Sequence, residues 1–197
     1  HDVKSVTGAF TGWSFDIPLV DRKRYGFPTE FRLRDEHDHG WKSFLGQVGR
    51  LNGEDVIDII VVQPATARFI CRRLYDFFVS DEPPVASWNE IPPENPQAID
   101  ILVKEYFDSG ADIRSILQVL FSSDFFKEAM FKKVKSPIEL VTAVIKLVGT
   151  HRFPERGLSE ALRQADEMGQ ALFQPLTVEG WHTGSEWIDG GTLNTRI

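Results

Sequence analysis

The stretch DIRSILQVLF, from Asp112 to Phe121, decides the fold class, because its apolar residues recur at the spacing of an α-helix. Asp112 is the predicted N-cap, since a carboxylate oxygen can accept hydrogen bonds from the first free amides of a helix. The face expected to be buried consists of Ile113, Ile116, Leu117, Leu120 and Phe121. This segment predicts a core built from packed helices.

Two neighbouring segments carry the same helical signal. An apolar stripe from Ile99 to Phe107 is followed by Gly110, and glycine at that position is typical of a left-handed helix C-cap. The string SPIE, from Ser136 to Glu139, combines an N-cap serine, a proline at the first helical position and a glutamate that completes a capping box. We therefore expect helix ends close to these residues.

The remaining segments divide into helices and one loop. Residues 53–80 are predicted to form a short helix and then a longer one, because Pro64 disfavours helical geometry at Gln63. Another helix is expected over about 159–173. Residues 80–96 contain five prolines and no apolar period, which indicates a Pro-rich loop.

Strand is expected only between residues 14 and 49. The alternation in TEFRLR, residues 29–34, predicts a half-exposed strand, and KSFLG, residues 42–46, is its candidate partner. The predicted fold class is therefore mainly α, a multi-helix bundle-like single domain over 1–197, with a small β-hairpin insertion near residues 27–46.

Apolar residues from all these segments are expected to share one helical core. The members of this predicted core are Trp13, Phe69, Leu74, Leu117, Val141, Leu162 and Phe173. Arg68, Arg72 and Asp76 follow one another at intervals of four, so we expect one solvent-facing or subunit-facing stripe. Cys71, the single cysteine, is expected to be a small buried hydrophobe.

Composition excludes several classes of function. The formal net charge of −7 argues against nonspecific binding to nucleic acid or anionic lipid, which requires clustered lysine and arginine. The one basic cluster, at residues 127–135, is interpreted first as a solvated surface, and a phosphate-binding patch is the less favoured alternative. A membrane span is not expected, since no apolar run approaches roughly 18 residues.

The densest group of ionisable side chains is the run from Asp35 to Lys42. His37, Asp38 and His39 could supply ligands to a divalent metal, with Gly40 permitting a tight turn, although their spacing matches no standard site. A structural alternative has Asp38 capping backbone amides while the histidines form local hydrogen bonds. Acid–base catalysis is a third interpretation, and Lys42 is included among the ligand-binding candidates.

Two tryptophans near the end of the sequence form the second candidate site. Trp181 and Trp187, with nearby acidic residues, could build a platform for carbohydrate or peptide. The alternative is that both indoles pin this segment onto the helical core, since large aromatic side chains are usually buried.

Five strings together resemble a bacterial family known as domain of unknown function 1800. They are AFTGW (9–13), HDHGWKSFLG (37–46), PATARFICRRL (64–74), KVKSPIELV (133–141) and MGQALFQPLTVEGW (168–181). Their order matches the C-terminal part of that family and spans nearly the whole chain.

The resemblance carries expectations about context rather than a reaction. It implies a C-terminal fragment of a longer chain, an exported protein that is periplasmic or extracellular, and a sulfatase-related protein partner. Three functions stay open: an exported protein-interaction or scaffold module, part of a metal-dependent hydrolase-like enzyme using His37, Asp38 and His39, and a glycan-binding module through Trp181 and Trp187.

Overall fold

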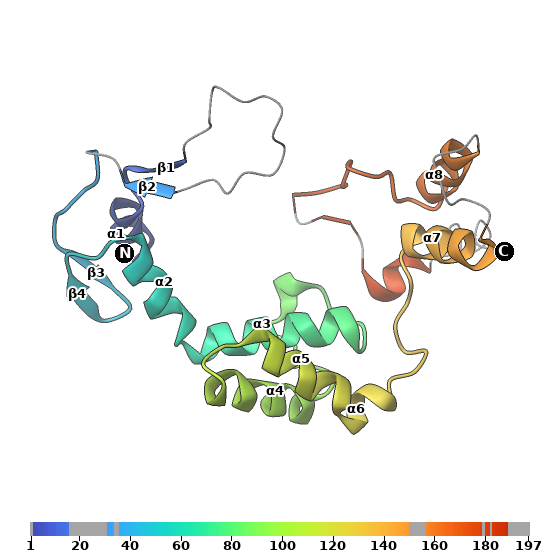
Figure 1. Ribbon diagram of the computed structural model, residues 1–197, viewed down its shortest axis with the longest axis horizontal. Coiled ribbons are helices and arrows are strands. Elements are labelled where there is room, and N and C mark those ends of the chain that lie inside the picture. Colours follow the sequence, from blue (N-terminus) through green and yellow to red (C-terminus); the bar gives the residue numbers. More distant parts are fainter. Residues whose placement is uncertain are drawn as a thin grey trace. The chain divides into compact units, whose positions relative to one another are not determined.

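The computed structural model describes residues 2–15, 31–33, 36–149, 157–178, 180, 181 and 183–188. The fold is mainly α with short antiparallel strands, as the sequence predicts (Figure 1). None of the helices in the described ranges is long and apolar enough to span a membrane. Contacts divide the chain into two compact units, His1–Ala67 and Arg68–Ile197. The expected single domain and fragment origin stay predictions.

The first unit combines two helices with two small hairpins. Its elements are α1 (Asp2–Ala9), β1 (Trp13–Phe15), β2 (Phe31–Leu33), β3 (Lys42–Phe44), β4 (Gln47–Gly49) and α2 (Gly53–Val61). Its core contains Ala9, Phe44, Val56 and Ile59, with Val6 and Leu51 packed against them. Within this unit α1 packs against β3, and α2 packs against α1.

The predicted pairing of TEFRLR with KSFLG is wrong. β2 pairs with β1, placing Leu33 opposite Trp13, while β3 pairs with β4, placing Lys42 opposite Gly49. Leu45 and Gly46 have φ values of 46° and 82°, which close β3 onto β4 through a two-residue turn. Because leucine seldom adopts positive φ, the dipeptide gave no turn signal in the sequence.

The second unit is built from helices and a long ordered loop. Its elements are α3 (Pro64–Phe78), η1 (Val85–Ser87), α4 (Pro96–Asp108), α5 (Ile113–Ser122), α6 (Asp124–Lys127), α7 (Pro137–Val148), α8 (Leu158–Glu167) and η2 (Gly184–Trp187). The interior contains Cys71, Ile99, Leu102, Ile116 and Leu120, each with an exposed fraction of 0 to 1%. α4 packs on α5, and α7 packs on α8.

Local capping signals predicted several helix ends correctly. The Asp112 side chain accepts hydrogen bonds from the amides of Arg114 and Ser115. Ser136 and Glu139 form the expected capping box, and Gly149 ends α7 in the left-handed conformation. The break between α2 and α3 also falls at Val62 and Gln63, immediately before Pro64.

The predicted seven-residue helical core is wrong. Trp13 lies on β1 in the first unit, whereas the other six residues belong to the second unit, and three of those six are exposed. Phe69 and Leu162 are each 49% exposed, and Phe173 is 93% exposed. α8 ends at Glu167 rather than near residue 173, and Phe173 itself has a φ of 63°. Phe173 therefore lies beyond the end of α8 and is not part of its apolar face.

Cys71 lies on the buried side of α3, as expected for a small hydrophobe. Burial raises the pKa of its thiol from an ordinary value of 9.0 to about 12. The thiol therefore stays protonated and enclosed in the folded protein at neutral pH.

We predict that Ellman's reagent at about pH 8 does not label the native protein, whereas unfolding in urea exposes one reactive thiol. Because the folded pKa is raised, the free energy of unfolding should decrease as pH rises from 9 towards about 12. A Cys71→Ala variant is the control, since it lacks this contribution. Rapid labelling of the native wild type would contradict the enclosed position.

Candidate functional site

The His37 turn is attached to the segment that follows α1. The Nδ1–H of His37 donates to the Thr11 carbonyl oxygen over 2.8 Å, and the Asp38 amide donates to Thr11 Oγ1 over 2.8 Å. Asp38 Oδ1 in turn accepts from the Gly40 amide at 2.7 Å. Buried Lys42 donates to the carbonyl oxygens of Asp38 and Gly40. Many of the hydrogen-bonding groups of this turn are therefore already paired within the protein.

These contacts bear on the metal hypothesis. The rings of His37 and His39 meet edge to face with centroids 4.7 Å apart. Across the described part of the chain, no group of three or more His, Cys, Asp or Glu side chains is placed to hold a metal ion. With Nδ1 engaged by a carbonyl, only Nε2 of His37 can serve as a ligand. The metal role of His37, Asp38 and His39 stays a prediction.

The predicted exposed stripe of Arg68, Arg72 and Asp76 is wrong at its centre. Arg68 is exposed and pairs with Asp100 at 3.0 Å, but the side chains of Arg72 and Glu82 are 7% and 0% exposed. Nε and Nη2 of Arg72 donate to Glu82 Oε2 over 2.9 and 2.6 Å. Helical spacing alone could not reveal this pair, because the loop supplies Glu82.

Arg72 also organises the rest of the Pro-rich loop. Its Nη1 donates to the Ile91 carbonyl oxygen over 2.9 Å, and its guanidinium carbon lies 4.5 Å from the centre of the Trp88 ring. Glu82 Oε1 accepts from the Glu94 amide at 3.0 Å. Residues 80–96 have no regular spacing of apolar residues, yet Arg72 contacts this loop at Glu82, Trp88 and Ile91.

Charge at this centre also affects Tyr75, a buried residue of α3. Burial raises the pKa of the Tyr75 hydroxyl above its ordinary value, and the negative charges of Glu82 and Glu94 raise it further. The hydroxyl therefore stays neutral to a more alkaline pH than that of a free tyrosine.

Asp81, next to Glu82, connects the loop to later parts of the chain. Its Oδ1 accepts from Lys133 Nζ and its Oδ2 from the Val134 amide, both at 2.8 Å. Gly184 at the start of η2, drawn red in Figure 1, is packed so closely that an added Cβ would lie 2.9 Å from Asp81 Cβ. Asp81 therefore helps to place the segment that carries both candidate tryptophans.

A cleft of about 730 Å³ lies between the Pro-rich loop with α3 and the segment that precedes and includes η2. We call it the Trp181 cleft, and its lining includes Phe69, Arg73, Asp76, Pro83, Pro84 and Trp181. Trp187 is only 4% exposed, so the structure does not bring the two tryptophans onto one open platform.

The indole N–H of Trp181 is buried and has no hydrogen-bond acceptor among the described residues. Leaving a buried donor unpaired costs about 1–3 kcal/mol. The sequence identified Trp181 as a candidate but not Phe69 or Arg73. Phe69 was assigned to the core, and Arg73 was given no role. Only the Pro83–Pro84 dipeptide, which favours a stiff extended wall, gave a local signal for this cleft.

The chain belongs to the family described as protein of unknown function (DUF1800), whose sequence model matches residues 1–197. No curated protein and no solved structure gives a significant match. Family membership is thus shown over the full sequence, while the chemistry has to be argued from the sites.

We predict that Gly184→Ala destabilises the second unit more than Gly110→Ala. Both glycines have left-handed φ values, 57° and 68°, where alanine costs about 1–2 kcal/mol. Only the Gly184 variant also brings a Cβ against Asp81, whereas nothing lies within 4 Å of the Gly110 position. Urea unfolding of the two variants measures the difference, and equal losses would show that η2 is not packed on Asp81.

Proposed function

We propose that the chain is a protein-interaction module whose second unit binds an amphipathic, acidic segment of a partner protein. The supporting observation is a run of edge-to-face aromatic rings, which we call the aromatic row: Phe77, Phe78, Phe121 and Phe126. Successive ring centroids lie 4.7, 5.1 and 5.1 Å apart. The row crosses from α3 to α5 and α6.

The aromatic row is open to solvent at two of its members. Phe77 is 66% exposed and Phe121 is 44% exposed. Clustered apolar surface of this kind is typical of interaction sites, and phenylalanine is enriched in protein interfaces. Because the rings already pack on one another, a partner could bury them without first ordering flexible side chains.

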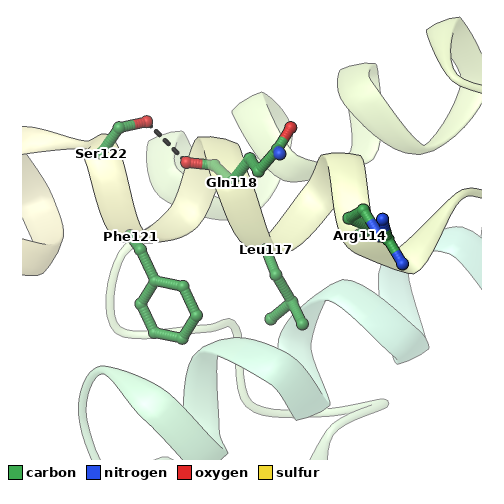
Figure 2. A pocket seen from close by; sticks show the side chains of 5 residues that line it. All are labelled: Arg114, Leu117, Gln118, Phe121 and Ser122. Carbon is green, nitrogen blue, oxygen red and sulfur yellow. Dashed lines mark hydrogen bonds between the residues drawn. The ribbon is translucent and has the colours of Figure 1, made fainter.

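A shallow hollow of about 810 Å³ extends the aromatic row along α5. Figure 2 shows Leu117 and Phe121 directed to the same side of the helix, with Arg114 one turn before Leu117. Arg114, Leu117 and Phe121 follow the spacing by which helices present side chains to a partner. The cationic end favours a partner that carries a carboxylate beside its apolar residues.

The family resemblance suggests a setting for this module. We propose an exported protein, with the sulfatase-related protein as the first partner to examine. A hydrolase based on His37, Asp38 and His39 has less support, because Thr11 and Gly40 already engage two of these side chains. Its test is titration of chelator-treated protein with zinc.

We predict that a photo-cross-linking phenylalanine analogue at position 121, expressed in the native host, captures a defined partner segment. The matched control places the analogue at position 173, which is 93% exposed and outside the aromatic row. The captured segment should have apolar residues at helical spacing and at least one acidic residue. Equal capture from both positions would contradict the proposal.

A synthetic peptide of the captured segment then tests the same surface by calorimetry. Phe77→Ser and Arg114→Glu should each weaken binding by about tenfold or more, since an interface depends on a few central side chains. Leu147→Ser, on the 87% exposed position of α7, is the control and should bind as the wild type. Unchanged binding by Phe77→Ser would reject the aromatic row as the docking surface.

A further inference from the structure

The Trp181 cleft offers a second type of recognition that the aromatic row does not explain. Its volume of about 730 Å³ falls within the range of about 300–1,000 Å³ that is typical of small-ligand sites. A neighbouring hollow of about 420 Å³ shares Arg73, Asp76, Trp181 and Thr183 with it. These four residues therefore lie where the two hollows meet.

The apolar surface of the cleft combines aromatic and proline rings with the aliphatic side chains of Val85, Ala86 and Leu176. Trp181 lines one side, and Phe69, which is 49% exposed, lines the α3 side. Pro83 and Pro84 form part of the wall, and the Pro83 carbonyl oxygen accepts from Trp88 Nε1 at 2.7 Å. Flat rings held in this way provide stacking surfaces at little entropic cost.

The charged groups that line the cleft are one guanidinium and two carboxylates. Arg73 Nη1 lies 3.6 Å from Asp76 Oδ2, and their side chains are 50% and 16% exposed. Glu186 also lines the cleft. Arg73 and Asp76 offset each other as an ion pair, and Glu186 already accepts a hydrogen bond from the Thr183 amide. The pair therefore suits a neutral ligand that carries both donors and acceptors.

We propose that the Trp181 cleft binds a neutral saccharide. A sugar ring would stack on the indole of Trp181, because its C–H face matches an aromatic surface. The hydroxyl groups would donate to Asp76 and accept from Arg73.

The test uses a panel of cello-, malto-, xylo- and chito-oligosaccharides with ¹⁵N-labelled protein. The Trp181 indole signal is assigned by its loss in Trp181→Phe. One member of the panel should shift this signal saturably while leaving the indole of Trp41, which is 73% exposed in the first unit, unchanged. No shift with any saccharide, or a shift only with a proline-rich peptide, would overturn the proposal.

Variants then separate a binding role from a folding role. Trp181→Ala should weaken saccharide binding by about tenfold or more, whereas Trp41→Ala should retain it. If Trp181→Ala does not fold, Arg73→Met serves in its place, because this side chain is half exposed and its loss removes hydroxyl-binding donors. Wild-type affinity in either folded variant would overturn the proposal.

Discussion

The buried ion pair between Arg72 and Glu82 is the interaction on which the second unit depends. Placing two opposite charges away from water is costly unless hydrogen bonds satisfy their remaining atoms. Arg72 meets this condition because it donates hydrogen bonds to Glu82 and to the Ile91 carbonyl oxygen. Glu82 meets it because it also accepts a hydrogen bond from the Glu94 amide. The pair therefore converts an irregular, Pro-rich segment into a fixed part of the fold.

The position of this loop determines one of the two proposed sites, the Trp181 cleft. The Asp81 carboxylate accepts hydrogen bonds from Lys133 and from the Val134 amide, and it packs against Gly184. The loop therefore links α3 to the segment that carries Trp181. The aromatic row instead rests directly on contacts between helices, through Phe78 and Phe121. Protein docking and saccharide binding therefore depend on different contacts, although Phe77 of the aromatic row also lines the smaller hollow beside the Trp181 cleft.

Local signals predicted several helix ends but neither proposed site. The caps at Asp112 and Ser136 involve residues within three positions, so sequence spacing predicts them directly. Arg72 looked exposed because arginine is seldom buried, and its partner comes from a loop without periodicity. The cleft joins Phe69 to Trp181 from distant parts of the sequence, and no local pattern encodes that contact.

A double-mutant cycle on Arg72→Met and Glu82→Leu, followed by urea unfolding, tests the central role of the ion pair most directly. Each single replacement leaves one buried charge without its partner and should cost about 3–5 kcal/mol, whereas the double replacement removes both charges. The double variant should lose much less stability than the sum of the losses of the two single variants. Additive losses, or singles that unfold like the wild type, would contradict this expectation.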